Sequence, residues 1–165
     1  MVRIRSIERT DLPAIAREPY SVTIDEPGDD LERLGALFAS TGFWQQDAGA
    51  IAIDSGGLKG TIQFFRSGPC IHGYELGYVI HDRREWGKGY ASAALKLLSD
   101  RLFVERPHIV RHQLTISCGN IASWKVAERC DFVREGILRA SGFGDDPKDS
   151  FVYSRVRREF EQAHR

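Results

Sequence analysis

An apolar run, a glycine-bearing turn and a helical pattern follow one another in this chain and constrain its fold more than any other feature. Residues 74–80 predict a strand, and residues 91–103 carry apolar side chains at helical spacing. Between them, Gly87 and Gly89 let the backbone turn tightly and bring its N–H groups close to an oxygen-rich ligand. The first turn of the helix adds N–H donors and a positive dipole end. The segment therefore predicts an anion site.

The composition predicts one compact domain and argues against nucleic acid as a partner. The chain has 165 residues, of which 42% are hydrophobic, which is enough for one core and cramped for two full domains. We therefore expect a single domain over residues 1–165. Lys plus Arg and Asp plus Glu both number 23, so the basic excess typical of nucleic-acid-binding proteins is missing.

The cysteines and the hydropathy predict neither a metal site nor a membrane partner. Cys70, Cys118 and Cys130 have unrelated spacings and form no Cys-x-x-Cys or Cys/His cluster, so we expect thiols that are mostly buried. The N-terminus resembles a strand rather than a signal peptide. No apolar stretch approaches the roughly 20 residues that cross a bilayer. We expect a cytoplasmic protein.

The remaining patterns predict a mixed sheet with helices on both faces. Strands are expected over residues 2–7, 48–53, 58–65, 74–81, 108–117, 132–138 and 151–156, with a hairpin at residues 55–57. Helices are expected from Thr10, after Asp30, over residues 91–103 and over residues 120–129. The charged tail after residue 156 is expected to be frayed.

Three known glycine patterns fail to match the turn. A P-loop requires Gly-x-x-x-x-Gly-Lys-Ser/Thr, but Asp82 stands at its first position and Gly89 follows Lys88. A dinucleotide fingerprint requires a third glycine where Ser92 stands. A protein-kinase loop would belong to a much longer enzyme.

One family pattern does match. Arg84-x-x-Gly87-x-Gly89-x-Ala91 resembles the Arg/Gln-x-x-Gly-x-Gly/Ala signature of the GNAT acyltransferase superfamily, whose turn cradles the pyrophosphate of coenzyme A. Residues 75–81 are similar to its fourth strand, and residues 120–136 are similar to the RimJ/RimL-like branch, which carries Asn-x-x-Ser, a short helix, Gly-Phe and Glu-Gly. The resemblance runs from residue 4 to about residue 159. It implies an α/β (α+β) GNAT fold, with a mostly antiparallel sheet of about seven strands.

Two residues depart from the pattern of this branch. Asp131 stands where glycine usually precedes phenylalanine, which affects a helix cap. Ala93 stands where many members carry Glu at the start of the long helix. The second change removes one acidic contact that the acceptor site of other members offers.

The resemblance implies an acetyl-CoA-dependent N-acetyltransferase in which a primary amine attacks the thioester directly in a ternary complex. The acceptor would be a protein or peptide N-terminus, or a small amine such as an antibiotic or polyamine. A non-catalytic acyl-CoA-binding sensor remains an alternative, since Ala93 and the unassigned base permit it. No metal is expected, and the closing strands could pair two copies into a homodimer. Loops over residues 19–30, 43–47 and 140–148 are expected to set specificity.

The resemblance also implies which residues hold the co-substrate. The turn donates backbone N–H groups to the pyrophosphate, and the end of the preceding strand pairs with the pantetheine arm and polarises the thioester carbonyl. The expected contacts are Val79, Ile80, His81, Arg84, Trp86, Gly87, Lys88, Gly89, Tyr90, Ala91, Asn120 and Ser123. Asn120 also suits a helix N-cap, and the two interpretations are compatible.

The expected catalytic residues are Glu75 and Ser123. Glu75 is the best candidate base, acting through a water, although a structural ion pair or an edge-facing charge would explain it equally well. His81 and His72 are further candidates. Ser123 is the candidate general acid toward the departing thiolate, with a helix-surface serine as its alternative.

The pKa of the acceptor decides how much base is needed. An amine of pKa about 10.4 is only about one part in 2,500 neutral at pH 7, a deficit of roughly 4.6 kcal/mol. An α-amine of pKa about 7.7–8.0 has a deficit of about 1 kcal/mol. With Glu75 as the one strong carboxylate candidate, the sequence favours acceptors of low pKa.

Overall fold

The computed structural model describes residues 1–16, 31–66, 72–141 and 147–165. The chain divides into two compact units. Unit 1 comprises Met1–Phe65 and Gly77–Leu98, and unit 2 comprises Arg66–Leu76 and Ser99–Arg165. Strand β4 (Gly73–Ile80) and helix α3 (Tyr90–Glu105) contribute residues to both units. Each unit is described separately below.

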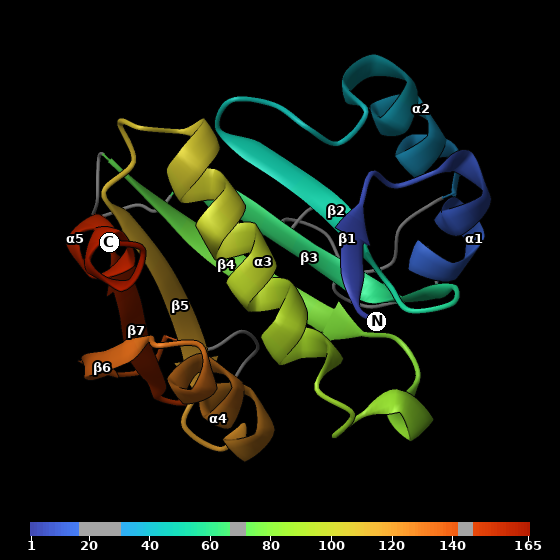
Figure 1. Ribbon diagram of the computed structural model, residues 1–165. Coiled ribbons are helices and arrows are strands. Elements are labelled where there is room, and N and C mark those ends of the chain that lie inside the picture. Colours follow the sequence, from blue (N-terminus) through green and yellow to red (C-terminus); the bar gives the residue numbers. More distant parts are fainter. Residues whose placement is uncertain (17–30, 67–71, 142–146) are drawn as a thin grey trace. The chain divides into compact units, whose positions relative to one another are not determined.

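The strands form a seven-stranded sheet in the order β1-β2-β3-β4-β5-β7-β6 (Figure 1). Besides β4, they are β1 (Arg3–Arg5), β2 (Ala48–Asp54), β3 (Leu58–Arg66), β5 (Arg111–Ser117), β6 (Val133–Leu138) and β7 (Ser150–Val156). The pairs β1–β2, β2–β3, β5–β7 and β6–β7 are antiparallel, and β4 pairs with β5 in parallel. The predicted mixed, mostly antiparallel sheet is confirmed.

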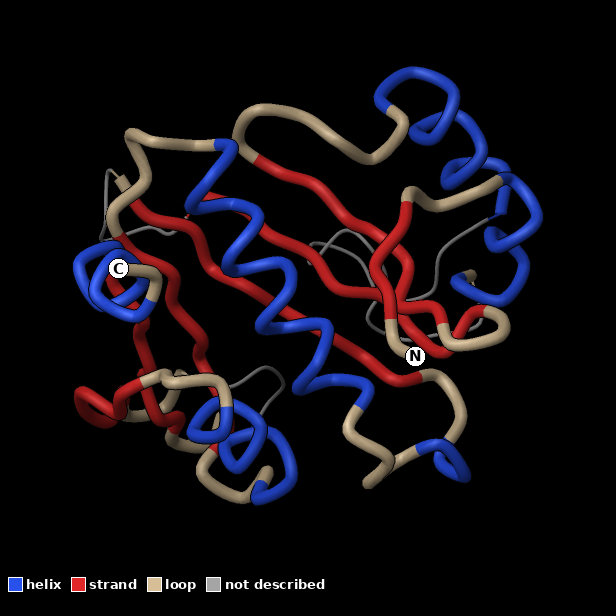
Figure 2. Tube along the Cα trace, in the orientation of Figure 1, coloured by secondary structure: helices blue, strands red, loops and turns tan. Residues whose placement is uncertain are grey.

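The helices lie close to where the sequence predicts them (Figure 2). They are α1 (Leu12–Ile15), α2 (Leu31–Thr41), α3, α4 (Ile121–Arg129) and α5 (Arg157–Ala163), with 3-10 turns η1 (Arg9–Asp11) and η2 (Arg83–Glu85). Pro13 stands in the first turn of α1, where its missing N–H has no intrahelical partner to lose. Asn120 caps α4.

In unit 1, the side chains of β2 alternate between two buried faces. Ala50 and Ala52 belong to an apolar cluster with α1 and α2, and Ile51 and Ile53 on the other face are also buried. The full cluster is Ile7, Leu12, Ile15, Leu34, Phe43, Ala50 and Ala52. In the first half of α3, Ala94, Leu95 and Leu98 are fully buried, as their helical spacing predicts.

An ion-pair cluster ties the N-terminal segment of unit 1 together. The Arg5 guanidinium lies 2.7 Å from a carboxylate oxygen of Asp11 and 3.0 Å from one of Asp54. Burial acts to raise the pKa of Asp11, but the hydrogen bonds from Arg5 and from the Glu8 backbone outweigh it and lower that pKa. Both carboxylates therefore stay ionised although little of either is exposed.

In unit 2, a buried arginine is held beside a neutral histidine. Arg155 Nη1 donates to Ser99 Oγ at 3.0 Å and to Asp100 Oδ1 at 2.6 Å. Ser99 Oγ lies 2.9 Å from His112 Nδ1. Burial, followed by the charges of Arg155 and Arg157, lowers the pKa of His112 to about 3. The ring of His112 is therefore uncharged and packs as an aromatic group.

The tail is helical, so the prediction of a frayed C-terminus is wrong. The Arg157 guanidinium donates to the carbonyl oxygens of Phe103, Arg106 and Ile109 at 2.8, 2.9 and 2.8 Å. The ring of Phe160 lies 5.3 Å from that of Phe103. These contacts join α5 to residues some 50 positions earlier in the chain, which local charge patterning cannot reveal.

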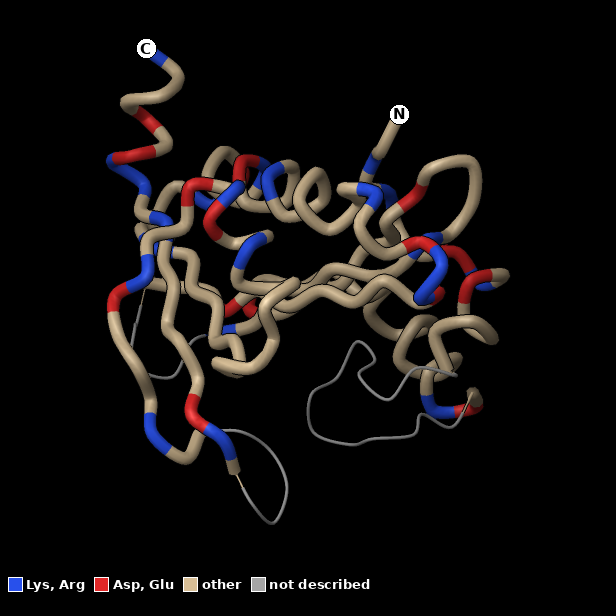
Figure 3. The backbone as a smooth tube through the Cα atoms, turned by 90° about the horizontal axis from the view of Figure 1, so that it is seen from below, with Lys and Arg blue, Asp and Glu red and all other residues tan. Residues whose placement is uncertain are grey.

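Charges of both signs are interspersed along the trace (Figure 3). Among the described helices, none is long and apolar enough to cross a membrane.

We predict that Arg157→Ala destabilises the protein by at least about 2 kcal/mol, because three carbonyls near the end of α3 lose a charged donor. The free energy of unfolding from urea titration measures this. Arg158→Ala is the matched control, since Arg158 is exposed, and should stay within about 0.5 kcal/mol of the wild type. Equal effects of the two substitutions would contradict the assigned role of Arg157.

Candidate functional site

The connection between β4 and α3 in unit 1 has the geometry of a tight, glycine-dependent turn. The Asp82 carboxylate accepts the Arg84 backbone N–H at 2.9 Å and so begins η2. Gly87 and Gly89 then adopt φ angles of +77° and +83°. These left-handed values strain most residues with a side chain. The chain thereby enters α3 at Tyr90 directly after the second glycine.

The N-terminus of α3 offers free donors beside open space. The first intrahelical bond runs from the Ala93 N–H to the Gly89 carbonyl at 3.0 Å. The amides of Tyr90 and Ala91 therefore have no acceptor within the helix. A Cβ placed on Gly87 or Gly89 would meet no atom within 4 Å. Such a helix end suits an anionic, oxygen-rich group.

The basic side chains around this turn are held by acids. Arg84 forms a bidentate pair with Asp82, with a closest approach of 2.7 Å, and lowers the pKa of Asp82 to about 2. The Glu85 carboxylate lies 2.9 Å from Lys88 Nζ and 3.2 Å from Lys59 Nζ, and these contacts lower its pKa. Ion pairs of Arg84 and Lys88, whose side chains are 89% and 52% exposed, are weak in water, so an anionic ligand can compete for these two cations. Sequence reasoning missed Lys59 and Glu85.

At the end of β4, the backbone groups of Ile80 and His81 point to opposite sides of the strand and have different hydrogen-bond partners. The His81 N–H donates to the Lys59 carbonyl at 3.0 Å and is therefore used within the sheet. Because backbone groups alternate along a strand, those of Ile80 point to the opposite edge. The Trp86 indole N–H donates to the Ile80 carbonyl at 3.0 Å, and Arg83 lies over the indole ring. The backbone of Ile80 therefore faces the edge of β4 that β3 does not cover. A contact of this edge with the pantetheine arm remains a prediction.

His81 and His72 differ as candidate bases. Burial lowers the pKa of His81, although the Asp11 charge acts in the opposite direction, so the imidazole is neutral at pH 7. Its Nε2 is buried and has no hydrogen-bond partner in the structure as described. His72 is exposed, and its backbone carbonyl accepts the Val110 N–H. A role of His81 or His72 as the base therefore stays a prediction.

In unit 2, Glu75 is half-buried and partnered by an amide. Its Oε2 accepts the side-chain N–H of Gln113 at 2.8 Å. Among the described residues the contact of Glu75 is with this amide and not with a cation, and its interpretation as a structural charge stays open. Its role as a base stays a prediction.

Asn120 and Ser123 lie at the start of α4 in unit 2. The Asn120 side chain accepts the Ser123 backbone N–H at 3.1 Å, which confirms the N-cap. Ser123 is half-buried in the first helical turn. A pantetheine contact for Asn120 and an acid role for Ser123 remain predictions. Cys118 is half-buried and Cys130 buried, whereas Cys70 lies outside the described residues.

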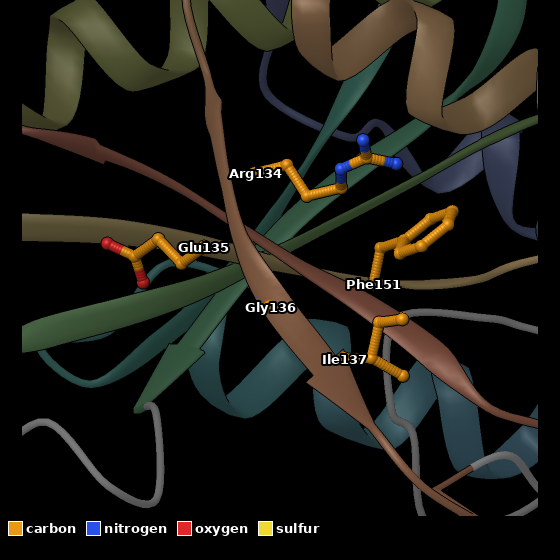
Figure 4. Close-up of a pocket in the computed structure, with 5 residues that line it drawn as sticks. All are labelled: Arg134, Glu135, Gly136, Ile137 and Phe151. Carbon is orange, nitrogen blue, oxygen red and sulfur yellow. The ribbon is translucent and has the colours of Figure 1, made fainter.

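The predicted specificity loops lie largely outside the described residues, and the described residues offer neither a metal-binding cluster nor a predicted site in the pocket beside β6. The loop over residues 19–30 and residues 142–146 of the loop over residues 140–148 lie outside the described residues. Within the described ranges, no group of three or more His, Cys, Asp or Glu side chains could hold a metal ion. A pocket of about 360 Å³ lies beside β6, lined by Arg134, Glu135, Gly136, Ile137 and Phe151 (Figure 4).

Comparison with known proteins gives a family and a set of similar folds. A family model described as "Acetyltransferase (GNAT) domain" matches residues 2–133. No curated protein matches. A variant of the spermidine/spermine N-acetyltransferase SpeG from Vibrio cholerae is 18% identical, covers 100% of both chains and has a TM-score of 0.81. A second SpeG variant is 19% identical over 99% of both chains with a TM-score of 0.80.

A third structure, a chimera of SpeG and hSSAT, is 17% identical over 97% of this chain and 98% of the other, with a TM-score of 0.76. At these identities the likeness concerns the fold. The GNAT fold and the acetyltransferase class expected from the sequence are confirmed. The RimJ/RimL-like branch stays a prediction.

Proposed function

Because the chain belongs to the GNAT acetyltransferase family, we propose that it is an acetyl-CoA-dependent N-acetyltransferase of the RimJ/RimL-like branch that works as one domain. The observation that carries the proposal is the turn before α3. Its two left-handed glycines precede helix amides that lack intrahelical acceptors, with open space beside them. That arrangement fits a pyrophosphate.

The described residues include the hydrogen-bond donors and the basic side chains that acetyl-CoA requires. The amides after Gly87, together with Lys88 and Arg84, would hold the pyrophosphate once the half-buried carboxylates of Asp82 and Glu85 are displaced. The backbone N–H of Ile80, on the strand edge opposite the one that His81 uses, would pair with the pantetheine arm, and the Asn120 side chain would also contact it. When bound, acetyl-CoA supplies an acetyl group activated as a thioester.

The proton chemistry falls to two side chains. Glu75 would take the proton of the acceptor nitrogen through a water. The Ser123 hydroxyl would give a proton to the departing sulfur. A thiol of pKa about 8.5 leaves readily near neutral pH, so loss of Ser123 should slow the enzyme modestly.

The acceptor is proposed to be a primary amine, either a peptide N-terminus or a small molecule such as an antibiotic or polyamine. The similar structures carry the names of spermidine acetyltransferases, which places polyamines among the amines to be tested. In the part of the chain that the structure describes, Glu75 has no cationic partner, so its charge remains available to an amine. The energetic cost of deprotonation favours acceptors of low pKa.

We predict that Gly89→Asp binds acetyl-CoA at least about tenfold more weakly than Gly89→Asn, a difference of about 1.4 kcal/mol. The two side chains have the same shape and tolerate positive φ equally, so only the charge at the helix end differs. Isothermal titration calorimetry measures both affinities, and equal values would contradict the pyrophosphate assignment.

We predict thiol release when the protein, acetyl-CoA and a suitable amine are combined. The panel contains N-terminal peptides, aminoglycosides, spermidine and free amino acids, each scanned from pH 6 to pH 9. Stabilisation by acetyl-CoA without thiol release from any amine would support the sensor alternative and contradict the proposed catalysis.

We also propose a homodimer formed through β6. This strand ends the sheet order and exposes Val133, Ile137 and Leu138 by 56, 57 and 44%. An exposed apolar edge strand can pair with the same strand of a second copy. Light scattering should give twice the chain mass of 18.6 kDa, and Ile137→Lys should reduce it to the single-chain value. A monomeric wild type would refute this proposal.

A further inference from the structure

A row of polar side chains crosses four strands of unit 2 and ends at Glu75. Glu75 of β4 stands opposite Gln113 of β5, and Gln113 stands opposite Ser154 of β7. Arg111 lies two residues before Gln113 and therefore on the same face of the sheet. Glu135 of β6 completes the row.

Hydrogen bonds connect the members of this row in sequence. Gln113 Nε2 donates to Glu75 Oε2 at 2.8 Å. Gln113 Oε1 accepts Arg111 Nη2 at 3.0 Å. The Arg111 guanidinium donates to both oxygens of Glu135 at 2.8 and 2.6 Å. Ser154 Oγ donates to Glu135 at 2.6 Å.

The orientation of the Gln113 amide is fixed from both ends. Arginine can only donate hydrogen bonds, so the amide oxygen must face Arg111. The amide NH₂ must then face Glu75, whose ionised carboxylate can only accept. Gln113 is only 7% exposed, so its side chain has little room to adopt another arrangement.

A β-bulge places Glu135 where it can hold Arg111. Arg134 pairs with Tyr153 and Gly136 with Val152, which leaves Glu135 as the additional residue of β6. Figure 4 shows its side chain pointing to the side of the strand opposite Arg134 and Phe151. The bidentate pair lowers the pKa of Glu135 to about 2, so it stays ionised as an anchor.

We propose that Gln113 is a positioning residue for Glu75, held in register by Arg111 and Glu135. The proposal rests on the proposed function, in which Glu75 is the base. One oxygen of Glu75 is occupied by the amide, which directs the other toward the acceptor.

The two ends of the row should respond to substitution with opposite signs. Gln113→Leu removes the donor to one oxygen of Glu75. The midpoint of the acidic limb of kcat/KM should therefore rise. Glu135→Gln removes the negative charge of the carboxylate that Arg111 contacts, so the positive charge of Arg111 is less balanced two side chains from Glu75. That midpoint should fall, because a nearby opposite charge favours the carboxylate.

The experiment measures the pH dependence of kcat/KM and, on the same proteins without substrate, the ¹³C titration midpoint of the Glu75 carboxyl. Glu75→Gln identifies the resonance and should lower kcat by about 10²–10⁴. Thr115→Val is the matched control, since Thr115 is exposed, shares the strand and face of Gln113, and stands outside the row. It should leave both midpoints unchanged.

Opposite shifts of the two variants in both measurements support the inference. Equal losses of activity at every pH, with unmoved midpoints, would show a merely structural row and overturn it. Shifts in the carboxyl titration without shifts in kcat/KM would also overturn it, since Glu75 would then not be the base. A wild type that releases no thiol refutes the proposed function instead, and the carboxyl titration then decides whether Gln113 controls Glu75.

Discussion

The candidate site depends on how the chain passes from β4 into α3. Within nine residues the backbone leaves the sheet at Ile80, forms η2 and enters the helix after Gly89. Left-handed φ angles at Gly87 and Gly89 make that path accessible, and the helix begins without a side-chain cap at the glycine. The same geometry leaves the amides of Tyr90 and Ala91 without acceptors inside α3. One local constraint therefore shapes the backbone and forms the candidate anion site.

Alternation along β5 divides unit 2 into an apolar and a polar face. His112 is fully buried, neutral and stacked 3.9 Å from the Phe103 ring, which makes it part of the core. Its neighbours Arg111 and Gln113 point to the other face and carry the row that ends at Glu75. A slip of one residue in the pairing of β5 would exchange the two faces. The register that buries the core is thus the register that orients the proposed base.

Short-range signals in the sequence predicted most of the fold and the turn. The spacing of Gly87 and Gly89, the apolar strand before them and the N-cap at Asn120 all involve residues close in the chain. The contacts that the sequence did not reveal join distant residues. Gln113 and Glu75 are 38 positions apart, and Arg111 and Glu135 are 24 apart. They meet only because strand order and a bulge align them, and neither is encoded in a local pattern.

The charge balance around Glu75 bears on the choice of acceptor. Asp11, Asp82 and Glu135 are each paired with an arginine, and the first cause of each lowered pKa apart from burial is that contact. Glu75 instead accepts from an amide that carries no charge. No cation pairs with this carboxylate in the part of the chain that the structure describes, so an ammonium group bound beside it would be attracted, and the same interaction would raise the pKa of that amine. An alkylamine, already about 4.6 kcal/mol from its neutral form at pH 7, becomes still harder to deprotonate. Deprotonation of an α-amine at pH 7 costs only about 1 kcal/mol. The same attraction therefore aids binding of an α-amine while the total cost of deprotonation stays small.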